Sequence, residues 1–238
     1  MEFWDENKKI LVILAHPDDP EFFCGATLAK WCREGHQVEY CLLTRGEKGV
    51  NDNFKGTSNI SKLRETEQLE AAKVIGVGKV LFLDNDDGFL EPTIDLRKQI
   101  VRVIRSERPD IVVTCDPSNY FIRDNYINHP DHRAAGEVVI EAIFPAAGNE
   151  LFFTELMSQE SLAPHSINEV WLSLPKEHNV VVDVTEYWEI KIKALEKHRS
   201  QIGELKQFRK RMIGRRAEDS DPENPRYEEF FRRITFKD

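Results

Sequence analysis

Three features are scarce in this 238-residue sequence, and each scarcity argues against a class of protein. No apolar run approaches the roughly 18 residues of a membrane-spanning helix, so we expect no membrane partner. The 4 cysteines have no C-x-x-C spacing, which favours reduced, mostly buried thiols over a disulfide framework. The 33 Lys and Arg are outnumbered by 42 Asp and Glu, which argues against nucleic acid as a partner because phosphate contacts need clustered basic residues.

The composition is otherwise that of a globular protein, with 40% hydrophobic and 32% charged residues. The length lies within the range of one α/β domain, and we interpret residues 1–238 as a single domain because no linker or repeat interrupts them. Residues 1–9 are polar and acidic rather than signal-like, so cytoplasmic localisation is the expectation. The basic segment 206–216 is typical of a solvated helix face.

Short apolar runs alternate with longer amphipathic segments along the chain. The pattern predicts strands at 10–15, 38–43, 79–83, 111–115, 168–174 and 179–184. It predicts helices at 21–33, 61–75, 92–107, 130–144 and 184–201, a long loop at 44–60, an irregular region at 148–168, and either a strand or a short helix at 226–234. Strands that alternate with helices indicate parallel βαβ units. The expected fold is therefore a three-layer, Rossmann-like, mostly parallel α/β sheet with helices on both faces and extra C-terminal strands and a helix.

Two His-Pro-Asp segments follow strands of this predicted sheet. His16-Pro17-Asp18-Asp19 comes directly after the first strand, and His129-Pro130-Asp131-His132 lies between the fourth strand and the next helix. In a doubly wound sheet of order 3-2-1-4-5, the first and fourth strands are neighbours, and their carboxyl ends border the crevice where ligands bind. We therefore expect the two segments to meet in that crevice.

Imidazoles and carboxylates gathered in one place suggest a cation. Two imidazoles and one carboxylate are a ligand set for catalytic zinc, which leaves a position for water and lowers the pKa of that water to about 7. These residue types also suit Fe²⁺ or another divalent metal. The alternative for either segment alone is a helix-start turn, in which Pro and Asp serve as ordinary capping residues. The remaining histidines fall outside the predicted crevice; they are His36, His165, His178 and His198.

At these residues the chain resembles the PIG-L/LmbE family of metal-dependent de-N-acetylases, which act on N-acetylglucosaminyl lipids, thiol-precursor glycosides and chitin fragments. The resemblance extends over most of the chain and includes ILAHPDDPE (13–21), GAT (25–27), TRGEKG (44–49), the helix with Arg64 and Glu67, NHPDHR (128–133) and EKHRSQ (196–201). It implies a hydrolase that removes an N-acetyl group from an N-acetylglucosamine-type sugar, with that small molecule as its partner. It also implies a homo-oligomer, a dimer or a hexamer.

The resemblance also implies residue roles. The zinc ligands would be His16, Asp19 and His132. Asp18 would be the general base for a zinc-activated water. His129 would stabilise the oxyanion, and Asp131 would orient the histidines from outside the ligand set. Sugar hydroxyls would be held by two further side chains, those of Arg64 and Asp87.

Several alternatives stay open on the residues alone. Arg64 could pair with Glu67 or Gln68 on its own helix, and Asp87 could serve only the turn that it occupies. Where many relatives have HPDDE, Pro20 is inserted before Glu21. The same site could cleave the amide of a thiol-glycoside conjugate or another small amide. A catalytically inactive sugar- or nucleotide-binding module is the alternative from another class, but the G-x-G-x-x-G of a nucleotide site is missing after the first strand.

Overall fold

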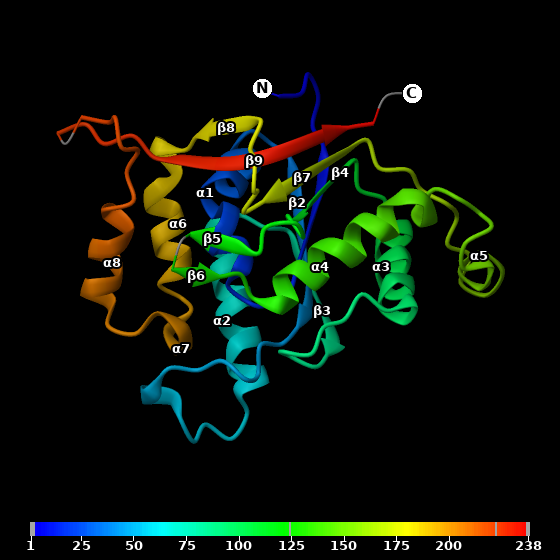
Figure 1. Ribbon diagram of the computed structural model, residues 1–238, viewed down its shortest axis with the longest axis horizontal. Coiled ribbons are helices and arrows are strands. Elements are labelled where there is room, and N and C mark those ends of the chain that lie inside the picture. Colours follow the sequence, from blue (N-terminus) through cyan, green and yellow to red (C-terminus); the bar gives the residue numbers. More distant parts are fainter. Residues whose placement is uncertain (1–2, 124, 222, 237–238) are drawn as a thin grey trace.

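The computed structural model describes residues 3–123, 125–221 and 223–236, and a central seven-stranded sheet organises them (Figure 1). Its strands are Lys9–Leu14 (β1), Gln37–Thr44 (β2), Lys79–Asn85 (β3), Ile111–Cys115 (β4), Glu169–Ser173 (β7), Val180–Asp183 (β8) and Glu228–Thr235 (β9). The order is β3-β2-β1-β4-β7-β9-β8. The first five strands in this order are parallel, and β9 runs antiparallel to both β7 and β8.

Helices cover both faces of the sheet. One layer holds Asp19–Arg33 (α1), Ile60–Ile75 (α2) and Trp188–Leu195 (α6), and the other holds Ile94–Glu107 (α3) and Pro130–Glu141 (α4) (Figure 1). The side chains of β1 alternate between the two apolar cores that result, with Val12 in one and Ile13 in the other. A strand buried on both faces is the reason for its uninterrupted apolar sequence. The predicted three-layer fold is confirmed.

Elements with a strong sequence pattern lie close to their predicted positions. Each of the first four predicted strands is present, and their predicted order in the sheet is confirmed. The helix predicted from residue 61 begins at Ile60 because the side chain of Asn59 accepts the backbone N–H of Lys62. It ends at Gly76, whose positive φ of 105° suits a residue without a Cβ. The four cysteines are free thiols, as expected, and no helix among the described residues has the length and apolarity to cross a bilayer.

The helix predicted at 184–201 is wrong in its extent. A short turn of 3-10 helix, Thr185–Tyr187 (η3), precedes α6, and a second short helix, Arg199–Ile202 (α7), follows it. Between α6 and α7 the backbone tightens, because His198 donates its N–H to the carbonyl of Leu195, three residues back. This turn carries the imidazole of His198 into the protein interior, where it contacts Glu21.

The segments without a clear periodic pattern were predicted less well. The helix predicted at 130–144 ends as an α-helix at Glu141 and continues as a π-helical turn, Ala142–Ala147 (η2), that contains Pro145, which has no N–H to donate. The region 148–168 contains a helix, Thr154–Glu160 (α5), and the open choice at 226–234 is resolved as strand β9. Further short elements are Asp52–Phe54 (η1), Phe121–Arg123 (β5), Tyr126–Ile127 (β6) and Leu205–Ile213 (α8).

Helix α4 lies unusually close to the sheet at Gly136. A Cβ at this position would overlap the backbone carbonyl of Cys115 on β4 and would lie 3.1 Å from Cδ of Pro117. Because backbone cannot move aside as a flexible side chain can, only glycine fits. The close approach packs the middle of α4 against the end of β4, and the first turn of the same helix carries the second His-Pro-Asp segment.

We predict that Gly136→Ala lowers the free energy of unfolding by about 2 kcal/mol, because the added methyl group overpacks the contact between α4 and β4. Urea denaturation followed by circular dichroism would measure the change. Gly78→Ala is the matched control, since its Cβ would meet only the carbonyl oxygen of Val38 at 3.8 Å; we expect a change within about 0.5 kcal/mol. Equal losses in both variants would contradict the close approach at Gly136.

Candidate active site

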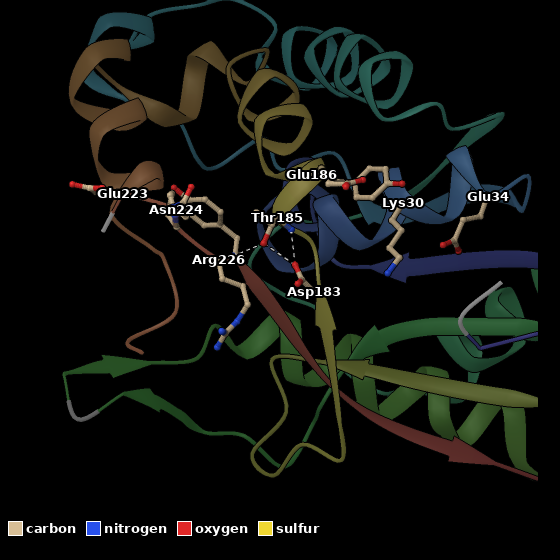
Figure 2. A pocket seen from close by; sticks show the side chains of 11 residues that line it. Lys30, Glu34, Asp183, Thr185, Glu186, Glu223, Asn224 and Arg226 are labelled. Atoms are coloured by element: carbon tan, nitrogen blue, oxygen red, sulfur yellow. Dashed lines mark hydrogen bonds between the residues drawn. The ribbon is translucent and has the colours of Figure 1, made fainter. Parts of the chain in front are cut away.

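A hollow of about 950 Å³ lies beside α1 and near the ends of β8 and β9 (Figure 2). It contains none of the predicted site residues and is lined by Lys30, Glu34, Asp183, Thr185, Glu186, Tyr187, Glu223, Asn224, Pro225, Arg226 and Tyr227. Within it, the carboxylate of Asp183 accepts hydrogen bonds from both the N–H and the hydroxyl of Thr185. Because the hollow holds none of the predicted site residues, the predicted chemistry lies elsewhere.

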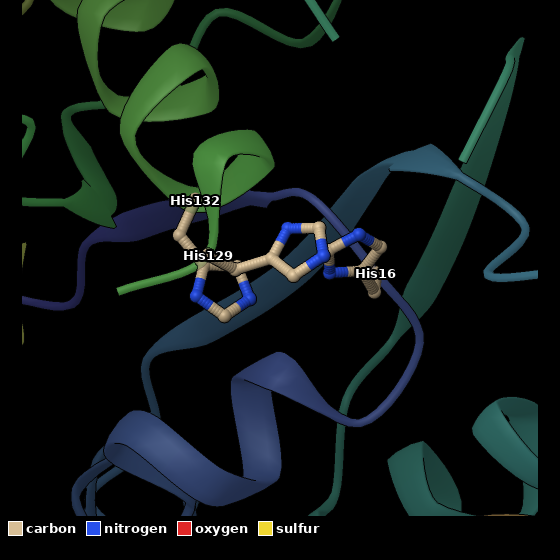
Figure 3. Close-up of side chains that lie close together, drawn as sticks. All are labelled: His16, His129 and His132. Carbon is tan, nitrogen blue, oxygen red and sulfur yellow. The ribbon is translucent and has the colours of Figure 1, made fainter. Parts of the chain in front are cut away.

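The two His-Pro-Asp segments meet in a different cavity, of about 800 Å³, at the carboxyl ends of β1 and β4. The ring centroid of His16 lies 4.9 Å from that of His129 and 5.2 Å from that of His132 (Figure 3). Every predicted site residue except Asp131 lines this cavity. The crevice between β1 and β4 thus brings the two His-Pro-Asp segments together, as the predicted strand order led us to expect.

Asp19, the last residue of the first segment and the first residue of α1, contacts a histidine of each segment. One carboxylate oxygen, Oδ2, lies 3.3 Å from Nδ1 of His16 and accepts the backbone N–H of the same residue at 2.8 Å. The other, Oδ1, lies 3.1 Å from Nε2 of His132. On its far side, the His132 ring lies with Nδ1 3.0 Å from Oδ1 of Asn128, which fixes the orientation of the imidazole.

This arrangement suits a divalent metal ion. Two groups of described side chains each place one donor atom per residue within 4.8 Å of the others: His16, His129 and His132 form one, and His16, Asp87 and Asp131 form the other. Asp19 belongs to neither group, but it contacts the rings of His16 and His132 with a different oxygen each, at 3.3 and 3.1 Å. Imidazole and carboxylate donors are those found at catalytic zinc sites.

Electrostatics around His16 point the same way. Its Nε2 lies 3.1 Å from Asp87 and 3.2 Å from Asp131, in addition to the contact with Asp19. Burial alone would lower the pKa of His16, but Asp19, Asp131 and Asp87 together raise it to about 12. Burial also opposes ionisation of Asp19, yet His132 and His16 hold its pKa well below the usual range. A buried group of carboxylates that retains a proton so strongly is one that binds positive charge.

His129 differs from the other two histidines in protonation and exposure. It is the N-cap of α4, and its Nδ1 accepts the backbone N–H of Asp131 at 3.1 Å. Burial, followed by the nearby His16 and His132, lowers the pKa of His129. The ring is therefore neutral near pH 7, and because Nδ1 is an acceptor, the proton is on Nε2. The half-buried side chain thus presents one N–H donor in the cavity.

Asp18 stands beside the predicted ligands in an unusual conformation. Its φ of 87° is in the left-handed region, which Asp adopts more readily than most residues but still at a cost of about 1–3 kcal/mol. The carboxylate lies 3.3 Å from Nη2 of Arg64. Burial raises the pKa of Asp18, while Arg64 and then His198 oppose that rise. Backbone strain at a buried carboxylate beside a cation site is typical of functional positions.

The other predicted contact residues have partners that link loops to the site. Arg64 does not pair within its own helix, because its guanidinium donates to the carbonyls of Gly46 at 2.6 Å and Pro17 at 2.5 Å; the intrahelical alternative is wrong. Asp87 is more than a turn residue, since it accepts the N–H of Lys48 at 2.7 Å and faces His16. Asp131 accepts the N–H of Gly88 at 2.7 Å and that of Leu90 at 3.3 Å, so it ties the turn after β3 to α4.

The sequence interpretation missed three buried residues behind Asp18. Gln68 accepts the N–H of Asp18 and donates to Glu21, which in turn contacts His198. Gln68 could have been found, because it lies four residues after Arg64 and so on the same face of α2. His198 lies in the EKHRSQ stretch that carries the family resemblance, but nothing in that stretch indicates a contact with Glu21 or Gln68. As predicted, it does not line the cavity, but it lies directly behind residues that do.

Known proteins are similar to this chain in sequence and in fold. The family model PIG-L, described as GlcNAc-PI de-N-acetylase, matches residues 11–143. A diacetylchitobiose deacetylase of Thermococcus kodakarensis is 37% identical over 203 residues, which cover 85% of this chain and 73% of that protein. A probable N-acetyl-alpha-D-glucosaminyl L-malate deacetylase 2 of Bacillus anthracis is 27% identical and is covered over 82% of its length, as is this chain.

A solved structure is also similar over nearly the whole of this chain. The N,N'-diacetylchitobiose deacetylase from Pyrococcus horikoshii, in complex with its inhibitor MPG, superposes with a TM-score of 0.85 at 29% identity and covers 98% of this chain and 88% of its own. The stretch matched by the family model contains both His-Pro-Asp segments and Arg64. The chain belongs to the PIG-L family of de-N-acetylases and is a deacetylase.

Proposed function

We propose that this chain hydrolyses the acetamide of an N-acetylglucosamine-type sugar or glycoside and releases acetate and a free amine. The observation that carries the proposal is the position of Asp18. It lines the same cavity as His16, Asp19 and His132, but its carboxylate pairs with Arg64. Both relatives are named for N-acetylated sugar compounds. A cavity of about 800 Å³ has room for such a substrate.

We assign zinc to His16, Asp19 and His132, whose donor types fit it and whose side chains are in mutual contact through Asp19. When bound, zinc supplies a Lewis acid that polarises the acetamide carbonyl and lowers the pKa of a water molecule. Asp131, 3.2 Å from Nε2 of His16, keeps that imidazole oriented.

Asp18 is the general base in this proposal. Its carboxylate takes a proton from the attacking water and returns it to the nitrogen of the leaving amine, so that the proton count balances. Arg64, 3.3 Å away, holds the carboxylate in place. A positioned general base contributes about 10²- to 10⁴-fold to the rate.

His129 provides the donor for the other half of the reaction. Because Nδ1 accepts the N–H of Asp131, the ring proton is on Nε2. This Nε2–H donates to the substrate's carbonyl oxygen as negative charge develops there. Asp87 and Arg64 line the same cavity, and we propose that they contact sugar hydroxyls.

The direct test measures acetate released from N-acetylglucosamine and N,N'-diacetylchitobiose by the purified protein. We expect activity that is lost after dialysis against a strong chelator and is restored by Zn²⁺ or Fe²⁺. A glycoside with a bulkier acyl group on the amine serves as the comparison for a broader amidase. Undiminished acetate release after complete metal removal would contradict the metal assignment.

We predict that Asp18→Asn retains zinc but loses about 10²- to 10⁴-fold in kcat, because asparagine cannot accept the proton. Initial rates and metal analysis on the same preparation would separate the two effects. A variant with nearly parental kcat would rule out Asp18 as the base.

We predict that His132→Ala lowers the zinc content at least about tenfold, since one of three protein ligands is removed. Elemental analysis after gel filtration measures the zinc bound per chain. His165→Ala is the matched control, because Nε2 of His165 lies 2.7 Å from the carbonyl of Pro109, away from the cavity. Equal zinc content in both variants would contradict the assignment of His132.

A further inference from the structure

The strained backbone of Asp18 must be held in place by neighbouring residues. The inference about which residues hold it rests on the proposed function, in which Asp18 is the base. At φ 87° and ψ −27°, Asp18 is the N-cap of α1, yet its side chain makes no capping hydrogen bond. L-residues leave the left-handed region unless their surroundings fix them there. The carboxylate of Asp18 moves with this backbone, so whatever holds the backbone also aims the proposed base.

Gln68 provides the restraint. Its side-chain oxygen accepts the N–H of Asp18 at 2.7 Å, and its side-chain NH₂ donates to both carboxylate oxygens of Glu21, at 3.0 and 3.1 Å. An amide side chain supplies a separate acceptor oxygen and donor nitrogen at one end. The two partners also fix the direction of the amide, because its oxygen must face the N–H and its nitrogen must face the carboxylate.

A third residue locks this arrangement from behind. Nε2 of His198 lies 3.2 Å from Glu21, and the side chains of Gln68, Glu21 and His198 are fully buried. The turn that carries His198 is fastened to α2 next to Gln68, because Ser200 donates its N–H and its hydroxyl to Glu67 at 2.8 and 2.6 Å. We call Gln68, Glu21 and His198 the positioning network.

We propose that Gln68, held by Glu21 and His198, is a positioning residue that fixes Asp18 for proton transfer. Within the described residues, no hydrogen bond or ion pair joins the positioning network to His16, Asp19 or His132. Gln68 thus bonds Asp18 directly and none of the proposed metal donors, and the zinc content of a Gln68 variant separates this role from a role in metal binding.

Gln68→Met tests the role, because methionine keeps the length of the side chain and removes its hydrogen bonds to both Asp18 and Glu21. We expect kcat for acetate release to fall about 10²-fold, as it does when a catalytic group is displaced by about 1 Å, with KM and zinc content near those of the parent. Gln99→Met makes the same chemical change on α3, where Gln99 contacts Asn85 and does not line the cavity. We expect that control to keep the parental kcat.

A double variant distinguishes positioning from a general structural defect. If Gln68 acts through Asp18, Gln68→Met causes no further loss of kcat in the Asp18→Asn background. A defect of folding would lower kcat by the same factor in both backgrounds. Equal factors would therefore overturn the proposal.

An exchange of the two side chains provides a rescue. Gln68→Glu alone places two carboxylates face to face, and we expect it to be as impaired as Gln68→Met. In Gln68→Glu with Glu21→Gln, the carboxylate at 68 accepts the N–H of Asp18, and the amide at 21 donates to that carboxylate and accepts from His198. This exchange should restore most of the lost kcat, and it decides the matter even if Gln68→Met fails to fold.

The outcomes separate two failures. An active parent with an undiminished Gln68→Met variant, or an exchange variant no better than Gln68→Glu alone, overturns the role of Gln68 and leaves the proposed function intact. A parent that releases no acetate from either sugar refutes the proposed function and this role together.

Discussion

The structure depends on the crowding of carboxylates around one imidazole. Asp19, Asp87 and Asp131 come from three different parts of the chain, and each places an oxygen within 3.3 Å of a His16 ring nitrogen. In a buried place such a group is stable only with compensating positive charge. The contacts around it are therefore better understood as one electrostatic group, and as a candidate cation site, than as separate ion pairs.

The fold provides two sources of partial positive charge at this place even before a cation binds. Helices α1 and α4 lie on opposite faces of the sheet, and both begin at the crevice between β1 and β4. Asp19 and Asp131 are each in the first turn of one of these helices, where unpaired backbone N–H groups favour negative charge. The topology therefore stabilises the carboxylates as well as bringing them together.

The parts of the molecule that could be predicted from the sequence are those with a local signature. The apolar run of β1 and the two His-Pro-Asp segments gave the order of the first strands and the meeting of His16 with His132. The break before α7, the strands β5 and β6 and the helix α5 have no such signature. The contact of His198 with Glu21 joins residues 177 positions apart, and only the packed structure reveals it.

Pro20, the residue that the family resemblance marks as an insertion, stands in the first turn of α1. At the start of a helix proline is tolerated because its missing N–H has no partner there. One extra residue turns the following side chain about 100° around the helix, and Glu21 accordingly does not line the cavity but faces Gln68 in the interior. The carboxylate of Glu21 thus lies behind Asp18 rather than at the cavity. This places two buried polar groups side by side, one around His16 and one around Gln68, with the turn from His16 to Asp19 between them.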